Sequence, residues 1–456
     1  MMRAFSLSEL SAPLRGRLVG QDVTFNRVST DTRSLAEGDL FVALSGDQFD
    51  GHHYLEQARA AGACAALVHG AMPSLDLPQM VVSDTQQALG LLGAYNRTLF
   101  DGALVAITGS SGKTTVKNMV HAVLSQRGKT LSTAGNFNNE IGVPLTLLRL
   151  TGDVEFAVVE MGAAGKGHIA WLCEIGRPSV SLLLNAMPAH LDGFGSVEDV
   201  AAAKGEIFDA LDTGDVAVIN ADQPWADQWR SRAGNARIID FGLQQPAAVT
   251  ATAVQLHGLD GVTFTAITPA GEALVKLSMP GQHNVANALA AIAVGLACQL
   301  SLDEICAGLA LAQPVSGRQR SERSASGAMV IDDCYNANPG SVKAAIDLLA
   351  QCPGRRSLLL GAMKELGERS VELHRETGAH AKSRGLEQLW GVGPELRDSV
   401  DAFGTGGRWF PDLDSLVAAL PGSFGSDDTV LVKGSRSTRM EQALEVLLAA
   451  QAQGES

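Results

Sequence analysis

A glycine-rich segment with a lysine and two threonines stands between an apolar stretch and a helix-like stretch. It reads Thr-Gly-Ser-Ser-Gly-Lys-Thr-Thr over residues 108–115, after the apolar run 103–107. Strand, glycine loop and helix in this order are typical of a phosphate-binding loop, in which backbone N–H groups surround a polyphosphate. Lys113 would then contact the outer phosphates, and the Thr114 hydroxyl could bind Mg²⁺. The segment therefore predicts a protein that uses a nucleoside triphosphate.

The spacing departs from the usual phosphate-loop pattern, whose first glycine would fall at Ile107. The alternative is a plain Gly-Ser turn with a solvated Lys113. A cation in the first turn of a helix opposes the helix dipole unless an anion is bound there, and this favours the phosphate loop. We therefore predict nucleotide contacts from the whole loop, namely Gly109, Ser110, Ser111, Gly112, Lys113, Thr114 and Thr115.

Polar side chains follow two further apolar stretches that we expect to be strands. Glu160 comes directly after residues 156–159, and a carboxylate at the carboxyl end of a strand can hold Mg²⁺ or its water. The alternative is a solvated glutamate. His190 comes shortly after the stretch 180–184; a lone histidine is usually structural, but one beside a phosphate-loop sheet is a candidate metal ligand.

Two polar clusters follow strand-like stretches in the last third of the chain. Residues 332–340 follow the apolar run 328–331, which indicates a ligand site, with a helix-capping loop as the alternative. Lys433 and Ser435 follow the run 429–432. The charges of the segment 433–436, Lys-Gly-Ser-Arg, would suit a substrate carboxylate or phosphate.

Composition limits the location and the partners of the chain. The 456 residues have a formal net charge of −14, which argues against nucleic acid or an anionic membrane as the main partner. The cysteines show no zinc-binding spacing and suit buried thiols in a reducing compartment. Residues 1–20 lack the apolar core of a signal peptide, and the longest apolar run, 288–298, is too short to span a membrane. We expect a cytoplasmic monomer with no membrane insertion.

Alternating strand-like and helix-like segments predict an α/β fold. A length of 456 residues suggests roughly three domains. In a parallel, doubly wound sheet, ligands bind at the carboxyl ends of the strands. We predict a small N-terminal α/β domain over 1–99, a central phosphate-loop domain with a mostly parallel sheet over 100–315, and a third α/β domain over 316–456.

Five segments together carry a resemblance to a known family. They are residues 108–115, 133–144, 189–196, 333–339 and 360–367. This set resembles the Mur ligases, the ATP-dependent amide ligases that extend the peptide of the bacterial cell-wall precursor, and the likeness runs from near residue 28 to near 440. The variant phosphate loop is that family's form, which accounts for Ile107. The resemblance implies an N-terminal domain that binds the UDP end of the precursor, a central P-loop ATPase and a C-terminal Rossmann-like domain that closes over the nucleotide.

The resemblance also implies roles for single residues. It places Lys113 on the ATP phosphates, and Thr114, Glu160 and His190 on two Mg²⁺ ions. Lys204, which on pattern alone is a surface lysine of the helix-like stretch 196–208, matches a lysine that family members carry as a carbamate. Catalytic roles are thus implied for Lys113, Lys204 and His190. Further ATP contacts are implied for Asn287, Arg318, Asp333, Asn336 and Asn338.

Within the family, the segments are most similar to members that join D-alanyl-D-alanine to UDP-N-acetylmuramoyl-tripeptide. This implies that ATP phosphorylates the terminal carboxylate of the tripeptide and that the amine of the dipeptide attacks the acyl phosphate. The products would be ADP, phosphate and the UDP-linked pentapeptide. The substrate contacts that we predict are Ser29, Asp31, Arg33 and Asp50 on the uridine side, with Asn138, Asn139, Lys433 and Ser435.

Two alternatives to this activity each require a motif that the sequence lacks. A sister ligase that adds a diamino acid would share the chemistry, but its Asp-Asn-Pro-Arg acceptor motif is absent. A regulatory P-loop nucleotide switch belongs to a different class. GTP switches read guanine through Asn-Lys-x-Asp, and this chain has no such motif. Dependence of nucleotide turnover on a peptide acceptor would separate an enzyme from a switch.

Overall fold

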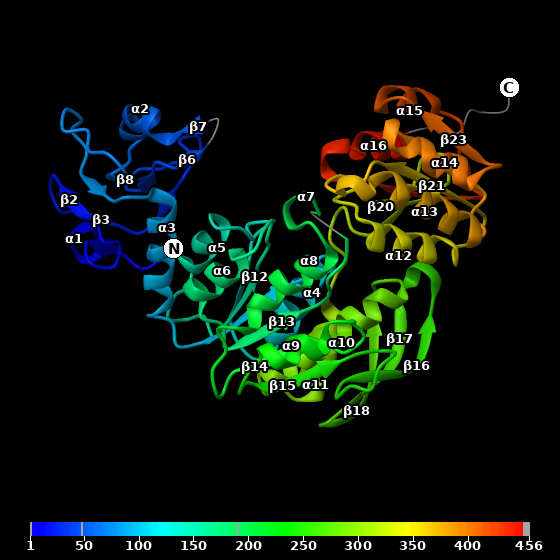
Figure 1. Cartoon of the computed structure of the whole chain (residues 1–456), viewed down its shortest axis with the longest axis horizontal. Coiled ribbons are helices and arrows are strands. Elements are labelled where there is room, and N and C mark those ends of the chain that lie inside the picture. The colour runs from blue at the N-terminus through cyan, green and yellow to red at the C-terminus, as the bar shows by residue number, and fades with distance from the viewer. Residues whose placement is uncertain (1, 47–48, 189–190, 450–456) are drawn as a thin grey trace.

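The computed structural model describes residues 2–46, 49–188 and 191–449 of the chain. Three mostly parallel sheets follow one another along these residues, each with helices packed against it (Figure 1). A smaller antiparallel sheet lies between the second and the third of them in the sequence. The predicted α/β fold class is confirmed.

The first sheet has the strand order β2-β9-β8-β5-β4, and every pair except β2 with β9 is parallel. Its helix α3 also packs against helices of the central part of the chain. The elements of this part are β1 (Phe5–Ser6), α1 (Leu7–Leu10), β2 (Arg17–Val19), β3 (Thr24–Phe25), β4 (Val28–Ser29), β5 (Leu40–Val42), β6 (Ser45–Gly46), β7 (Phe49–Asp50), α2 (Leu55–Ala60), β8 (Ala65–Val68), β9 (Gln79–Val81) and α3 (Thr85–Arg97).

The central sheet has the order β11-β12-β10-β13-β14-β15, and all of its neighbouring strands are parallel. Its elements are β10 (Ala103–Thr108), α4 (Lys113–Leu124), β11 (Thr130–Ser132), α5 (Gly142–Leu147), β12 (Phe156–Glu160), α6 (His168–Gly176), β13 (Val180–Leu183), α7 (Leu191–Phe194), α8 (Val197–Gly205), β14 (Val216–Asn220), α9 (Ala226–Arg232) and β15 (Arg237–Phe241).

Side chains of β10 alternate between two hydrophobic cores, as successive side chains of a strand must. Val105 and Ile107 pack with residues of α4 and of the later helix α10 (Gln282–Ala297). Leu104 and Ala106 pack with residues of α5, α6 and α8 on the other face. Because both faces of the strand are buried, ligand chemistry is confined to its carboxyl end, where the glycine-rich loop begins.

An antiparallel sheet of β16 (Thr250–Leu256), β17 (Val262–Thr268) and β18 (Gly271–Leu277) was not predicted from the sequence. Buried residues alternate with partly exposed ones along the whole of β17. This two-residue period is the pattern expected of a half-buried strand, so the signal was present in the sequence. The helices α10 and α11 (Leu302–Leu311) follow this sheet.

The C-terminal sheet has the order β19-β20-β24-β21-β22-β23, with only β19 antiparallel to its neighbour. The elements are β19 (Arg320–Arg323), β20 (Met329–Asp333), α12 (Pro339–Leu349), β21 (Arg355–Gly361), α13 (Ser370–Ser383), β22 (Gln388–Val392), α14 (Arg397–Phe403), β23 (Gly407–Phe410), α15 (Leu413–Ala419), β24 (Asp428–Lys433) and α16 (Glu441–Ala449).

Across the part of the chain that the structure describes, no helix combines the length and the apolar character that crossing a membrane requires.

His374 lies fully buried in α13 and is bonded through both ring nitrogens. Its Nδ1 donates to the carbonyl of Ser370 at 2.7 Å, and its Nε2 accepts from the backbone N–H of Met363 at 3.0 Å. Burial lowers the pKa of His374 below its usual value of 6.5, with smaller opposing contributions from the Ser370 bond and Glu395. Protonation of Nε2 would remove the acceptor of the Met363 N–H.

We therefore expect His374 to make the fold sensitive to acid. The folded pKa lies below the unfolded value near 6.5, so the unfolded chain binds the proton first as the pH falls. The contribution of His374 is intact above pH 6.5 and is lost as the pH falls to the folded pKa, by up to about 1.4 kcal/mol per pH unit. Denaturant unfolding at pH 7.5 and 5.5 would measure this. His374→Gln should show a smaller pH dependence than the wild type, and an equal dependence in both proteins would contradict the expectation.

Candidate active site

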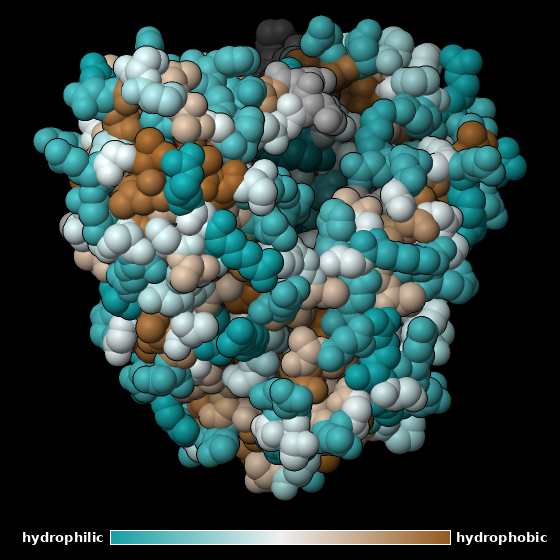
Figure 2. Space-filling view, turned by 60° about the vertical axis from the view of Figure 1, so that its left-hand side comes forward, coloured by the Kyte–Doolittle hydropathy of each residue, from teal (hydrophilic) through white to brown (hydrophobic). Residues whose placement is uncertain are grey.

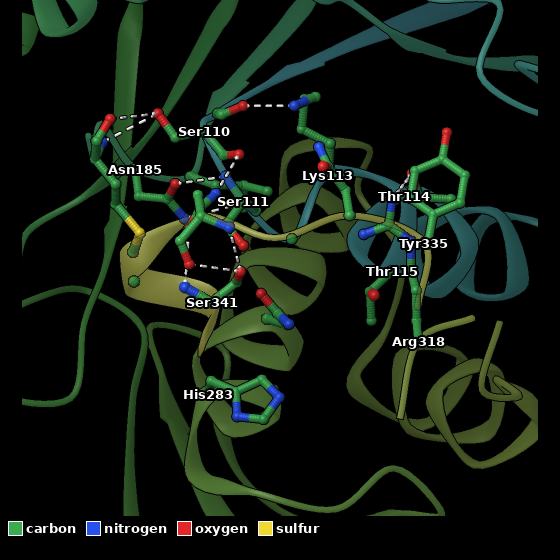
Figure 3. A pocket seen from close by; sticks show the side chains of 18 of the residues that line it. Ser110, Ser111, Lys113, Thr114, Thr115, Asn185, His283, Arg318, Tyr335 and Ser341 are labelled. Atoms are coloured by element: carbon green, nitrogen blue, oxygen red, sulfur yellow. Dashed lines mark hydrogen bonds between the residues drawn. The ribbon is translucent and has the colours of Figure 1, made fainter. Parts of the chain in front are cut away.

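The carboxyl ends of the central and C-terminal sheets meet at a cavity of about 630 Å³ (Figure 3). Its lining also includes the first turns of α10 and α12 and part of the segment 314–319 between the two sheets. Most of the residues predicted to bind ATP, metal or substrate lie on this one lining. They are Gly109, Ser110, Ser111, Gly112, Lys113, Thr114, Thr115, Asn138, Asn139, Glu160, Lys204, Asn287, Arg318, Asp333, Asn336, Asn338 and Lys433.

The glycine-rich loop turns sharply between β10 and α4. Gly112 has a φ of +83°, in the left-handed region that favours glycine. Asn185 brackets the loop from the neighbouring strand end, because its Oδ1 accepts from Ser111 N at 2.9 Å and its Nδ2 donates to Ser111 O at 3.1 Å (Figure 3). The hydrogen bonds between the Asn185 side chain and the backbone of Ser111 therefore fix the loop where it lines the cavity.

Lys113 supplies a positive charge to this loop. Its Nζ donates to the carbonyl of Gly109 at 2.7 Å, and no carboxylate in the described part of the chain forms an ion pair with it. Burial lowers the pKa of Lys113, Glu160 opposes this shift, and Arg318 adds to it. An anion in the cavity would offset the cost of keeping this ammonium charged, which makes the loop suited to a phosphate.

Thr114 and Glu160 bring two oxygen ligands together. Glu160 ends β12 and pairs in register with Ile107 of β10, which places its carboxylate beside the loop. Thr114 Oγ1 donates to Glu160 Oε2 at 3.0 Å and accepts from Arg318 Nη2 at 3.2 Å. The other oxygen of Glu160 accepts from Asn138 Nδ2 at 2.8 Å.

This donor set fits Mg²⁺. Magnesium prefers hard oxygen ligands and usually takes one or two carboxylates, with waters and substrate phosphates completing its shell. Among the described residues no group of three or more His, Cys, Asp or Glu side chains is placed to hold a metal ion. A hydroxyl and a single carboxylate next to a phosphate loop suit an ion that is completed by phosphate oxygens.

Lys204 is buried, which corrects the sequence expectation of a surface lysine. It lies in α8, is 2% exposed and lines the cavity. Burial, with a smaller contribution from the charge of Lys113, lowers its pKa to about 7. The hydrophobic pattern of α8 did not reveal this burial, because the segments that line the cavity around Lys204 are distant from α8 in the sequence.

Asp333 and Lys433 form a buried ion pair at the ends of the neighbouring strands β20 and β24. Lys433 Nζ lies 2.6 Å from Asp333 Oδ2 and also donates to the carbonyl of Asn336 at 3.0 Å. Burial raises the pKa of Asp333, and Lys433 opposes that rise. Lys433 therefore orders the polar loop 333–338, and its charge is already matched within the protein.

Two contacts join the C-terminal part of the chain to the phosphate loop. Arg318 reaches Thr114, as described above, and its guanidinium lies 4.4 Å from the ring centre of Tyr335 (Figure 3). Asn338 Nδ2 donates to Ser110 O at 3.4 Å. Both sheets thus contribute to a single site around the phosphate loop.

Comparisons with known proteins agree with this arrangement. Three family models match the chain: the Mur ligase family catalytic domain at residues 24–96, the Mur ligase middle domain at 107–295 and the Mur ligase glutamate ligase domain at 317–436. The chain is 44% identical to the UDP-N-acetylmuramoyl-tripeptide--D-alanyl-D-alanine ligase of Escherichia coli, over 98% of this chain and 99% of that protein. The chain belongs to the Mur ligase family. The resemblance drawn from its sequence segments is confirmed.

Solved structures give the same result. MurF from Acinetobacter baumannii superposes with a TM-score of 0.93 at 34% identity and covers 98% of this chain and 99% of its own. MurF ligase from Thermotoga maritima, solved in complex with ADP, superposes with a TM-score of 0.82 at 30% identity and covers 92% and 96%. The fold of this Mur ligase is therefore that of the MurF structures along nearly its whole length.

The predicted uridine-side residues do not line the cavity and lie in the first α/β part of the chain. Asp31 pairs with Arg33 at 2.7 Å, which lowers the pKa of Asp31 to about 2. Ser29 Oγ donates to the carbonyl of Asp31 at 2.9 Å. Asp50 accepts from His52 Nδ1 at 2.7 Å. Their role as substrate contacts stays a prediction.

Two other predicted residues are not part of the described cavity lining. Ser435 is buried behind the cavity lining, where its Oγ accepts from Lys364 N at 2.9 Å, so it supports a loop and does not face the cavity. His190 lies outside the described residues. Its predicted role as a metal ligand is therefore not tested.

Sequence reasoning missed several side chains that shape the site. Thr133 Oγ1 accepts from Glu160 N at 2.9 Å and so fixes the carboxylate-bearing end of β12. His283 Nε2 lies 2.8 Å from Gln319 Oε1, beside Arg318. Tyr335 stacks with Arg318. Local sequence did not reveal these contacts, because the partners are distant in sequence.

Proposed function

We propose that this protein is an ATP-dependent ligase that joins D-alanyl-D-alanine to UDP-N-acetylmuramoyl-tripeptide in peptidoglycan precursor synthesis. The products are ADP, phosphate and UDP-N-acetylmuramoyl-pentapeptide. The observation that carries the proposal is the 44% identity, over almost the full length of both chains, to a ligase of that name. The cavity supports it, because a phosphate loop, an oxygen donor pair and a buried lysine share one lining.

The first chemical step activates the tripeptide. A carboxylate is a poor target for an amine until one of its oxygens becomes a leaving group. The terminal carboxylate oxygen attacks the γ-phosphorus of ATP, the bond to ADP breaks and an acyl phosphate forms. Lys113, the N–H groups of residues 109–115 and Arg318 hold the phosphates and offset the charge that spreads over them in the transition state.

The second step forms the amide bond. The free amine of D-alanyl-D-alanine attacks the acyl carbon, and the tetrahedral intermediate expels phosphate. Asn138 and Asn139, on the cavity lining next to Glu160, are proposed contacts of the peptide end. Enclosure of the acyl phosphate between the two sheets would limit its hydrolysis by water.

Two Mg²⁺ ions and a carbamate on Lys204 are part of the proposal. Thr114 and Glu160 would hold one ion between them and the phosphates, and a carbamate at Lys204 would supply oxygens for a second, with His190 as a further ligand. Mg²⁺ supplies charge neutralisation at the transferring phosphoryl group. The observation that fits the carbamate is a cavity-facing lysine whose pKa is lowered to about 7, because only the neutral amine reacts with CO₂.

The proposal also gives each of the three parts of the chain a role. We assign residues 1–99 to binding of the UDP precursor, 100–315 to ATP binding and 316–456 to a Rossmann-like ligase domain. Asn287, Arg318, Asp333, Asn336 and Asn338 are the proposed further nucleotide contacts. A cytoplasmic location and a monomeric state stay predictions.

One assay tests the function directly. ADP release is measured with UDP-N-acetylmuramoyl-tripeptide, ATP and Mg²⁺, with and without D-alanyl-D-alanine. We expect sustained turnover only when the dipeptide is present, with one pentapeptide formed for each ADP. Equal turnover without the dipeptide would favour the regulatory nucleotide switch and reject the ligase.

A further inference from the structure

Both ends of α8, the helix that carries Lys204, are tied to the loop that follows Glu160. This loop, residues 161–167, runs from the end of β12 to the start of α6. At the start of α8, Asp199 Oδ1 lies 2.6 Å from Lys166 Nζ. Just beyond its end, Glu206 reaches the first turn of α6. The strand that ends at Glu160 and the helix that carries Lys204 are therefore linked through this loop and the start of α6.

Glu206 makes the more specific of these two connections. Its Oε1 accepts from Gly167 N at 2.8 Å, and its Oε2 accepts from Ala170 N at 3.1 Å. Gly167 is the N-cap residue of α6 and has no side chain to cap the helix. Glu206 therefore caps α6 from outside the helix, and each of its carboxylate oxygens accepts one backbone N–H. A carboxylate is also favoured at a helix N-terminus by the helix dipole.

Lys204 is close to this cap in the sequence. Lys204 lies two residues before Glu206, and no hydrogen bond or ion pair within the described part of the chain fixes its ammonium. Its terminal nitrogen is therefore placed by the backbone of α8 and by the packing around the buried side chain. The Lys166–Asp199 pair adds less, because both side chains are partly exposed to solvent.

We propose that Glu206 is a positioning residue that sets the separation between Lys204 and Glu160 by clamping the end of α8 to the start of α6. This inference rests on the proposed function, in which Lys204 carries a carbamate that completes the second Mg²⁺ site. The clamp would keep Lys204 on the cavity lining that it shares with the phosphate loop, where a carbamate would supply oxygen ligands to a metal ion. Loss of the clamp lowers occupancy of the carbamate and of its metal, while the phosphate loop keeps its contacts with ATP.

The test compares Glu206→Gln with Glu198→Gln. The glutamine at 206 keeps one acceptor oxygen and loses the other, so one of the two N–H groups of α6 is left unpaired. Glu198 is exposed, lies in the first turn of the same helix and is not part of the cavity lining. Both variants are made in the full chain. If Glu206 has a structural role only, Glu206→Gln should lower the melting temperature without changing the fraction of Lys204 that carries the carbamate.

The decisive readout is the carbamate itself. Wild type and variants are equilibrated with ¹³C-bicarbonate and Mg²⁺, and the lysine carbamate signal is recorded by ¹³C NMR alongside ligation kinetics. We expect Glu206→Gln to lose at least half of the signal, to need at least tenfold more Mg²⁺ for half-maximal turnover and to change the KM for ATP less than threefold. Glu198→Gln should match the wild type in all three.

Several outcomes would overturn the inference. A wild-type carbamate signal and Mg²⁺ requirement in Glu206→Gln would do so, and so would a turnover-competent wild type without any carbamate signal. If Glu206→Gln does not fold, Glu206→Asp is judged by the same criteria. Failure of the proposed function has a different signature, because the wild type itself would then not consume D-alanyl-D-alanine.

Discussion

Lys113→Ala is expected to lower ligation turnover by at least about a thousandfold, since preorganised charge is usually the largest contribution to phosphoryl transfer. Lys113 is the first residue of α4, and within the described part of the chain its ammonium donates only to the Gly109 carbonyl. Removing it leaves the transferred phosphoryl group without its nearest fixed cation. The fold should persist, because Lys113 contributes no side chain to either hydrophobic core of the central sheet.

The measurement is ADP release with all three substrates, together with thermal unfolding of the same sample. Lys129→Ala is the matched control, since Lys129 lies in the same part of the chain with its side chain 61% exposed. It should retain wild-type turnover. A Lys113→Ala variant that keeps a tenth of the wild-type rate would refute the role of the charge.

The phosphate loop could be predicted from the sequence because all of its determinants are local. An apolar strand, two glycines and a lysine at the start of a helix occur within about a dozen residues, and each acts on the backbone next to it. Glu160 and Asp333 were found for a similar reason, since each ends an apolar strand of a parallel sheet. The ends of parallel strands meet at one edge, so a strand assignment already implies a position.

The features that could not be predicted depend on contacts between distant segments. Lys204 is buried where segments distant in sequence line one cavity, and the sequence of α8 alone carries no sign of them. Arg318 reaches Thr114 across 204 residues, and Asn338 reaches Ser110 across 228. Ser435 follows a strand end as Asp333 does, yet its side chain turns into the loop 362–364. Position at a strand end therefore fixes where a residue lies, but not which way its side chain points.

The contacts between the two sheets explain why the site needs both. The phosphate loop supplies the ammonium and the hydroxyl, while Arg318 and Asn338 approach from the C-terminal side. Such a site is complete only when the two parts are close together. Binding of a nucleotide that contacts both sides would stabilise that arrangement, because a ligand favours the state in which it makes more contacts.

Lys204→Ala is expected to lower turnover by at least about a hundredfold, the scale of loss seen when one electrostatic group of an active site is removed. An ammonium beside the phosphate loop would repel Mg²⁺, whereas a carbamate offers two anionic oxygens. The lowered pKa, about 7, leaves a substantial neutral fraction at physiological pH to react with CO₂. The residue is 2% exposed and lines the cavity, so alanine leaves a hole that opens into the cavity.

That hole allows a rescue experiment that tests the chemistry of Lys204 and not only its presence. A small carboxylate such as acetate can occupy the space and return anionic oxygens to the metal, so added acetate should raise the turnover of Lys204→Ala several-fold. Lys204→Arg should be equally inactive and should not respond, because its bulk fills the hole and its charge stays positive. Acetate should leave the wild type unchanged, which controls for salt effects. Near-normal turnover of Lys204→Ala without added acid would show that the second metal ion is held by other residues.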